Sequence, residues 1–266
     1  MGAPDKPFRL GALPPTRKLQ TRCGALEYAL SGEGRPPIVL FNGAGMTLEG
    51  WRGLYPDVES IGATLAWNRF GVDGSDPPGA LQSGALVVAA VRELLSYLAI
   101  APPYVLAGHS IGGLYANLFA RLHPREVAGV LLIEATHPRD EEVLHMDEGR
   151  LLRSLGKVLA LPTWLFQDNL HSEIEAVGHL AREVQAAGPF PDVPVTVITG
   201  GMPPPRWLMP HEALQARLAH QQELARLSPR GEHVIARGSG HFPQLSEPQV
   251  VIDALARLVT RARRGG

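Results

Sequence analysis

Short apolar segments, separated by stretches of helical character, constrain the fold of this chain more than any other feature. The segments have the length of strands and lie at 25–30, 37–42, 64–68, 104–109, 127–134, 193–200 and 232–238. Several of them are apolar throughout, which is typical of strands buried on both faces of a parallel sheet. Helical patterns occupy 84–99, 111–123 and 247–263. The alternation predicts an α/β fold with a mostly parallel central sheet and helices on both faces.

Two regions depart from this alternation. Residues 1–18 are rich in proline and basic residues and are expected to form an arm or an edge segment. The interval 139–192 has helical character, no apolar strand and many large apolar residues. A long insertion between short strand–helix units is more often a cover over a site than a spacer. We therefore expect a core domain of 1–138 and 193–266 with a helical lid, 139–192, inserted in it; helices that only extend the core are the alternative.

Composition and charge exclude several classes of protein. The 266 residues hold 25 Lys and Arg against 26 Asp and Glu, so the basic excess that nucleic-acid binding needs is missing. The single cysteine, Cys23, excludes an internal disulfide and a multi-thiolate metal site and favours a reducing compartment. No segment has the length of a membrane span, and residues 1–20 lack the apolar core of a signal peptide. We expect a cytoplasmic protein without a nucleic-acid or membrane partner; nothing in the sequence indicates its oligomeric state.

Motifs for metals and cofactors are missing as well. The sequence has no His-Glu-x-x-His, no Cys-x-x-Cys and no G-x-G-x-x-G after a strand, and Asp73 and Asp76 lack the spacing of a calcium loop. We therefore expect neither a metal nor a cofactor. Arg69 lies in the same glycine-rich segment, 68–76, where it could brace the loop or pair with an acid.

A candidate nucleophile lies in residues 107–113, Ala-Gly-His-Ser-Ile-Gly-Gly, which contain the pattern G-x-S-x-G. The pattern falls between an apolar strand at 104–109 and an apolar helix at 111–123, where a sharp turn lifts Ser110 above the sheet edge. This position, more than the string itself, indicates a catalytic serine. The alternative is a glycine-rich turn in which Ser110 only caps the helix.

With this turn the chain resembles the α/β-hydrolase family over about residues 25–260. Three segments carry the resemblance, and they are similar to the nucleophile turn, the loop after the fourth strand and the histidine loop of that family: LAGHSIGGLYANLFARLHPREVAGVLLIEATHP, WNRFGVDGSDPP and GSGHFPQLSEPQVVIDAL. The resemblance implies a serine hydrolase on an α/β-hydrolase fold. Haloalkane dehalogenases and epoxide hydrolases of this fold carry an aspartate where this chain has Ser110, so we expect neither of those reactions.

A serine hydroxyl needs a base to take its proton, and a base needs an acid to orient it. His241 lies in a glycine-flanked loop after the last strand, late in the chain as the order Ser, acid, His requires. His109 is carried by the nucleophile turn, so its ring should point away, and His123 and His137 are expected to be surface or packing residues.

The acid needs an unusual supplier, because no carboxylate follows the strand at 193–200 before Glu212. Glu134 ends the apolar strand at 127–134, where burial is costly without a partner such as a histidine N–H. Haloalkane dehalogenases carry their acid after this strand, and LLIEATHP is similar to their segment. We assign Glu134; its alternative role is a strand-end carboxylate bound by backbone N–H groups or an arginine. Three other carboxylates remain as candidates: Asp140, Glu141 and Asp168.

The oxyanion of acyl transfer is expected to bind two backbone N–H groups. One belongs to Ile111, directly after the nucleophile. The other belongs to Ala44 in the loop Phe-Asn-Gly-Ala-Gly-Met, 41–46. Relatives often show His-Gly at this point, and the departure to Asn42 bears on the geometry of the loop more than on the donor. A plain glycine-rich turn is the alternative.

These residues together predict a serine hydrolase that cleaves carboxylic esters through an acyl-enzyme intermediate, with a Ser110, His241, Glu134 triad and no cofactor. A small-molecule substrate, an apolar ester, is expected from the apolar residues of 139–192 and of 202–209. The same triad could act on amide, thioester or carbon–carbon bonds or transfer an acyl group. A ligand-binding protein that keeps only slow hydrolysis is the alternative from another class.

Overall fold

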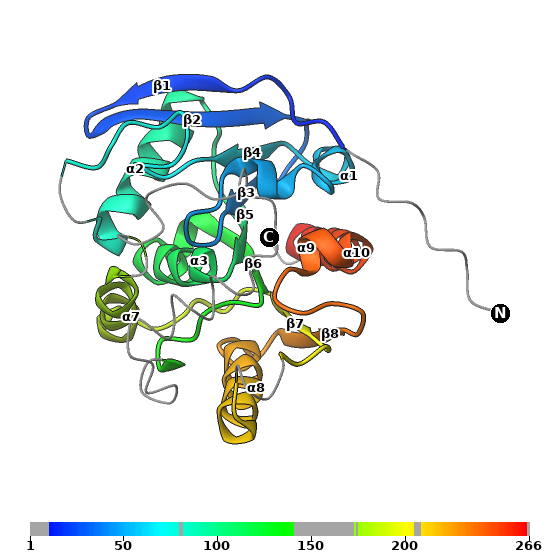
Figure 1. The fold of residues 1–266 in the computed structure, drawn as a ribbon. Coiled ribbons are helices and arrows are strands. Elements are labelled where there is room, and N and C mark those ends of the chain that lie inside the picture. The colour runs from blue at the N-terminus through cyan, green and yellow to red at the C-terminus, as the bar shows by residue number, and fades with distance from the viewer. Residues whose placement is uncertain (1–10, 80–81, 141–172, 174, 205–208, 265–266) are drawn as a thin grey trace.

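An eight-stranded sheet forms the centre of the part of the chain that the structure describes (Figure 1). The structure is a computed structural model, and it describes residues 11–79, 82–140, 173, 175–204 and 209–264. The strand order is β1-β2-β4-β3-β5-β6-β7-β8. The pairs β1–β2 and β2–β4 are antiparallel and the others are parallel, so the predicted fold class is confirmed.

The strands coincide with the apolar segments of the sequence, except for the first. They are β1 (Arg17–Thr21), β2 (Gly24–Ser31), β3 (Ile38–Phe41), β4 (Thr64–Trp67), β5 (Tyr104–His109), β6 (Val127–Ile133), β7 (Val195–Gly200) and β8 (Gly231–Ala236). β1 begins at the end of the segment 1–18 that was expected to be an arm or edge, and it is the edge strand of the sheet. Every residue of β3, β4 and β5 is buried, as strands covered on both faces require.

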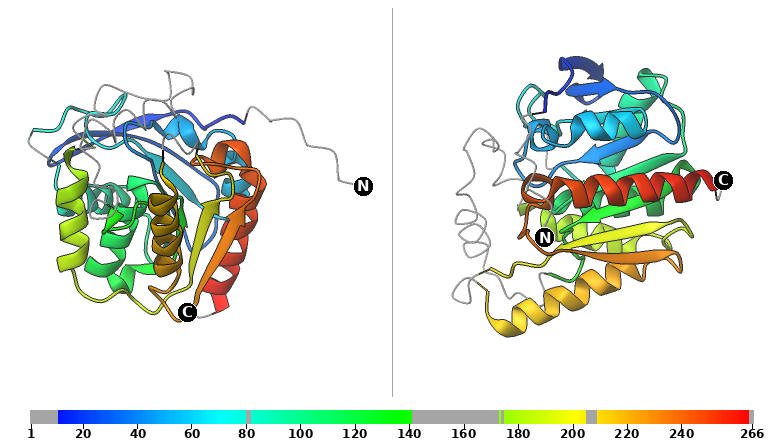
Figure 2. Two further views of the ribbon diagram at one scale, coloured as in Figure 1. Left: turned by 60° about the horizontal axis from the view of Figure 1, so that its bottom comes forward. Right: turned by 90° about the vertical axis from the view of Figure 1, so that its right-hand side faces the viewer.

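Helices cover both faces of the sheet (Figure 2). They are η1 (Leu48–Trp51), α1 (Tyr55–Ile61), α2 (Gly84–Tyr97), α3 (Ile111–Leu122), η2 (Pro124–Glu126), α7 (Val177–Ala186), α8 (His211–Ala225), α9 (Pro243–Ser246) and α10 (Pro248–Arg264). One apolar cluster joins α2, α3 and α7 to the sheet, and a second joins η1, α1 and α10 to its other face. Among the described residues, no helix has both the length and the hydropathy that crossing a membrane requires.

The helix α7 lies in the interval expected to form the lid. It lies within 139–192, yet Leu180 and Val184 are buried in the same apolar cluster as α2 and α3. Its apolar residues recur with helical spacing, so one face of the helix covers the core. α7 therefore packs with the core, and the boundary of the lid at 193 stays a prediction. Residues 141–172, where the rest of the lid is predicted, lie outside the described residues.

The carboxyl ends of the parallel strands meet at one edge of the sheet, where sites of open α/β folds are usually built. β3, β5 and β6 lead there into the loop 42–47, Ser110 and Glu134, and β8 leads into the loop that carries His241. The topology thus gathers the candidate site residues from segments that are far apart in the sequence.

Candidate active site

Ser110 occupies a strained turn between β5 and α3. Its backbone has φ 54° and ψ −123°, a conformation that residues other than glycine rarely adopt. The turn is also tightly packed: a Cβ on Gly108 would lie 2.4 Å from the carbonyl oxygen of Gly112, and a Cβ on Gly112 would lie 2.2 Å from that of Phe41. Both glycines of the G-x-S-x-G pattern are therefore needed for the close approach of strand, turn and helix. This is the strand–turn–helix context that the sequence predicted.

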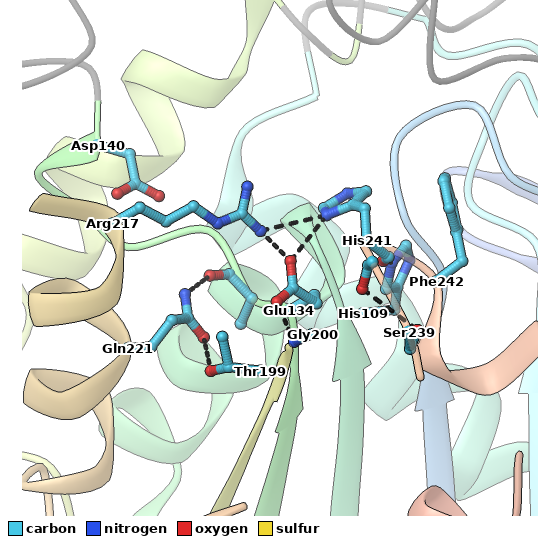
Figure 3. Close-up of polar contacts among 12 residues, drawn as sticks. His109, Glu134, Asp140, Thr199, Gly200, Arg217, Gln221, Ser239, His241 and Phe242 are labelled. Carbon is cyan, nitrogen blue, oxygen red and sulfur yellow. Dashed lines mark hydrogen bonds and ion pairs between the residues drawn. The ribbon is translucent and has the colours of Figure 1, made fainter. Parts of the chain in front are cut away.

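Glu134 and His241 lie in contact at the end of β6 (Figure 3). Glu134 Oε2 is 3.2 Å from Nδ1 of His241, and Oε1 accepts the backbone N–H of Gly200 at 2.6 Å. The glutamate is 4% exposed. Its burial acts to raise the pKa, but the charge of Arg217 and the hydrogen bonds from His241 and Gly200 outweigh burial and lower the pKa of Glu134 to about 2. The carboxylate is thus ionised and able to hold an imidazole N–H.

Arg217 also binds this carboxylate, so the partners considered for the alternative role of Glu134, a backbone N–H and an arginine, are present together with His241. Its side chain reaches from α8 to the acid, where Nη2 forms an ion pair with Oε2 of Glu134 and lies 3.3 Å from Nδ1 of His241 (Figure 3). Arginine and histidine therefore share one carboxylate oxygen. α8 is held in place beside the acid because Gln221 Nε2 donates to the carbonyl of Ala135 at 2.7 Å. No helix was predicted at 211–225, so the sequence carried no signal for this contact.

The structure also places Ser110 and one of the alternative acids, Asp140. Ser110 adjoins Glu134 because β5 and β6 are neighbours, with His109 in register with Ile133. Among the described residues, the Ser110 hydroxyl makes no hydrogen bond, which is common for a nucleophile and its base in the absence of substrate. Asp140 does not contact His241, since its oxygens bind His220 Nδ1 and a backbone N–H. Glu141 and Asp168 lie outside the described residues.

The side chain of His109 contacts the loop that carries His241. It is 1% exposed, and its Nε2 is 2.8 Å from the carbonyl oxygen of His241. Burial lowers the pKa of His109 to about 3, so the ring is neutral at pH 7. A carbonyl can only accept, hence Nε2 carries the proton and donates it. His109, which adjoins Ser110, thereby fixes the backbone of His241.

The loop 42–47 carries the second predicted oxyanion donor. Asn42, where relatives often have histidine, is buried and donates from Nδ2 to the carbonyl of Trp67 at 3.1 Å, and it accepts the indole N–H of Trp51. Asn42 therefore ties β3 to β4 and η1. Within the described part of the chain, the N–H groups of Ala44 and Ile111 donate to no other residue. Both remain available to an oxyanion.

Arg69 and Glu173 form a buried ion pair beneath this loop. The exposed fractions of their side chains are 2% and 3%, and Arg69 Nε lies 2.5 Å from Oε1 of Glu173. Arg69 thus pairs with an acid, which is one of the two roles considered for it, and it binds carbonyls of the loop 42–47 rather than of its own segment 68–76. Glu173 lies in the interval 139–192, and sequence reasoning gave it no role.

A second polar cluster lies between the loop after β6 and α8. His137, Asp140 and His220 could each offer one metal ligand, and the atoms lie within 4.8 Å of one another. However, His137 Nδ1 accepts the N–H of Arg139 at 3.1 Å, so its proton lies on Nε2, the atom that faces Glu223. His220 Nδ1 faces Asp140 Oδ1 at 2.7 Å. In this state the cluster is a hydrogen-bonded link between the loop after β6 and α8.

The known proteins similar to this chain include hydrolases. The sequence matches the profile of the alpha/beta hydrolase family over residues 38–254. It is 27% identical over 263 residues to a pimeloyl-[acyl-carrier protein] methyl ester esterase of Edwardsiella ictaluri, covering 87% of this chain and 96% of that protein. A stretch of 69 residues is 39% identical to a longer uncharacterized protein of Schizosaccharomyces pombe, of which it covers 13%.

Solved structures share the fold at low sequence identity. An esterase from Thermogutta terrifontis superposes with a TM-score of 0.68 at 18% identity, over 93% of this chain and 99% of that one. A variant of an epoxide hydrolase from Vigna radiata superposes equally well, with a TM-score of 0.68 at 15% identity over 92% and 98%. The same fold thus supports different reactions, and the side chains of the site must decide between them.

Proposed function

This chain belongs to the alpha/beta hydrolase family, and we propose that it is a serine hydrolase that cleaves carboxylic esters of small molecules through an acyl-enzyme intermediate. One observation carries the proposal: an ionised, buried Glu134 contacts Nδ1 of His241 at 3.2 Å beside a serine held in a strained strand-to-helix turn. This is the arrangement that nucleophilic acyl transfer needs. Serine rather than aspartate at position 110 favours acyl transfer over the epoxide opening that the fold also supports.

The proposed reaction assigns one role to each group. His241 Nε2 takes the proton of the Ser110 hydroxyl as its oxygen attacks the ester carbonyl, and then returns the proton to the leaving alcohol. Glu134 keeps the proton of the neutral ring on Nδ1 and stabilises the imidazolium. The N–H groups of Ile111 and Ala44 bind the oxyanion. Water then attacks the acyl-enzyme with the same base, which releases the acid and restores Ser110.

The ester bond as the target is supported by relatives. The Edwardsiella ictaluri protein is a methyl ester esterase, and it matches this chain over most of both lengths. We further propose an apolar group in the ester. Phe242 lies beside the base, with its ring 5.0 Å from that of His241, and Met202 on the neighbouring loop is 56% exposed. Both side chains suit an apolar acyl or alcohol group at the rim of the site.

Replacement of Ser110 by alanine tests the proposal. Ser110→Ala should abolish hydrolysis of p-nitrophenyl butyrate and labelling by a fluorophosphonate, because both need the serine oxygen, while the circular dichroism spectrum stays unchanged. Full activity of the variant would end the proposal. Wild-type protein that resists the fluorophosphonate would favour a ligand-binding protein. A panel of matched esters, amides and thioesters, with and without an acceptor alcohol, distinguishes ester hydrolysis from the other reactions of the same triad.

A further inference from the structure

The buried pair Arg69–Glu173 binds the backbone on both sides of Ala44. Arg69 Nη1 donates to the carbonyl of Asn42 and Nη2 donates to that of Gly43, each at 2.7 Å. Glu173 Oε2 accepts the N–H of Gly45 at 2.6 Å. Among the described residues, the N–H of Ala44 has no acceptor in the loop or elsewhere. The pair therefore binds polar groups on both sides of Ala44 and leaves the Ala44 N–H without an acceptor among the described residues.

The peptide bond between Gly43 and Ala44 determines where the Ala44 N–H points once Arg69 binds the Gly43 oxygen. It is not among the cis bonds of the described residues, so it is trans and planar. In a trans peptide the C=O and the N–H point in opposite directions. Because Arg69 holds the Gly43 oxygen on one side of the loop, the Ala44 N–H must point to the other side. A rotation of this peptide would break the bond from Arg69.

The pair itself is rigid. Arg69 Nε lies 2.5 Å from Oε1 of Glu173, and Nη2 lies 2.9 Å from Oε2, so the guanidinium and the carboxylate meet as two planar forks. The guanidinium also lies 5.2 Å from the centre of the Tyr115 ring, on which it can stack. With both side chains almost fully buried, little freedom remains for either to release the loop.

We infer that Arg69 and Glu173 are positioning residues that aim the Ala44 N–H at the oxyanion, an inference that rests on the proposed function. Stability alone does not explain the pair, because apolar side chains of similar volume often replace a buried ion pair without loss of stability. Apolar side chains cannot bind two carbonyls and an amide, however. Glu173 lies in the interval 139–192, so this segment contributes to the chemistry as well as to the covering of the core.

The double variant Arg69→Met/Glu173→Leu tests the inference. It removes the clamp, which is the pair Arg69–Glu173 bound to the backbone of the loop 42–47, and it fills the buried volume with apolar side chains. The kcat for p-nitrophenyl butyrate should fall by about 10²-fold, the usual effect of losing one oxyanion donor, with little change in KM. The inhibition constant of an aryl trifluoromethyl ketone should rise by a similar factor, because its adduct with Ser110 carries the oxyanion. A purely structural role would change neither value in a folded protein.

The single variant Arg69→Lys keeps the charge but loses the planar fork, and its kcat should lie between those of wild type and the double variant. It decides the question if the double variant does not fold. Wild-type kcat and inhibitor binding in folded Arg69→Lys, or in the folded double variant, would overturn the inference.

Arg92 and Glu126 provide a matched control. Their pair is also two-pronged, with distances of 2.9 and 2.5 Å, and it joins α2 to η2 away from the site. Arg92→Met/Glu126→Leu should leave kcat and inhibitor binding unchanged; an equal loss there would overturn the inference. Failure of the proposed function looks different, since Ser110→Ala would then stay active. An inactive Ser110→Ala together with a fully active clamp variant would refute only the clamp.

Discussion

The two arginine–glutamate pairs at this site differ in how completely their side chains are buried. Arg69 and Glu173 are 2% and 3% exposed, and the pair binds three backbone groups of the oxyanion loop. Arg217 is 23% exposed, and its Nη2 shares the Glu134 oxygen with His241. The first pair fixes a backbone and takes no part in proton movement. The second includes Glu134, whose other partner, His241, changes charge in the proposed reaction.

The difference shows that similar ion pairs can serve opposite requirements. A backbone donor for an oxyanion must be fixed before substrate arrives, since reorganisation during the reaction costs rate. A triad acid must instead respond when the imidazole becomes an imidazolium. Arg217 lowers the pKa of Glu134 and so keeps it ionised, but its positive charge also competes for the oxygen that the imidazolium of the proposed reaction would bind. The buried pair Arg69–Glu173, called the closed pair below, should therefore act mainly through geometry and stability. The partly exposed pair Arg217–Glu134, called the open pair, should act mainly through charge.

The largest effect is expected from the acid of the open pair. Glu134→Gln leaves the site almost unchanged in shape but favours the wrong tautomer of His241, so kcat should fall by about 10³–10⁴-fold. Steady-state hydrolysis of p-nitrophenyl butyrate measures it. Asp140→Asn serves as the control because Asp140 binds His220 rather than His241, and it should keep kcat near that of wild type. A reversed result would assign the acid to Asp140.

Breaking the closed pair from one side should destabilise the protein. Glu173→Gln removes the charge that compensates Arg69 and leaves a buried guanidinium unpaired, at a cost of about 3–5 kcal/mol in the free energy of unfolding. Urea denaturation measures this cost. The double variant Arg69→Met/Glu173→Leu should recover most of it. A single variant as stable as wild type would mean that solvent reaches the pair, contrary to its burial.

Breaking the open pair should cost less and depend on pH. Arg217→Gln should lower the free energy of unfolding at pH 7 by about 1–2 kcal/mol, because Glu134 keeps the N–H groups of His241 and Gly200. The folded-state pKa of Glu134, about 2, lies below the ordinary 4.5, so its stabilisation is present above pH 4.5 and is lost as pH falls toward 2. The variant raises this pKa, so its deficit should shrink between pH 4.5 and 2.

Urea denaturation at pH 7 and pH 3 measures this deficit. Arg226→Gln is the control, because Arg226 is exposed on the end of the same helix and its side chain binds none of the described residues. It should show little deficit at either pH. A deficit of Arg217→Gln that stayed constant with pH would show that the arginine acts through packing and not through the charge of Glu134.

Local patterns in the sequence were sufficient for much of the fold. β5 spans 104–109 as predicted, and α3 and α10 end within a residue of their predicted limits. A buried strand shows in the sequence as a short apolar run, and an amphipathic helix shows as apolar residues at helical spacing. β1 was expected only as an edge segment, and α8 was not predicted, since its surface mixes polar and apolar residues without a clear apolar face. The lid boundary stays a prediction, because the helical character of α7 fits a lid and a core helix equally well.

The sequence by itself determined the alternation that builds the sheet, the glycines around Ser110 and the carboxylate that ends β6. These features depend on neighbours in the chain, so spacing reveals them. Only the tertiary structure decided that Glu173 binds Arg69, 104 residues away, and that Arg217 binds Glu134 across 83 residues. Each of these partners is one charged residue among many, and the positions of charged residues in the sequence follow no period that would reveal which of them pair. Which charges meet follows from the order of the strands and from the helices packed on them.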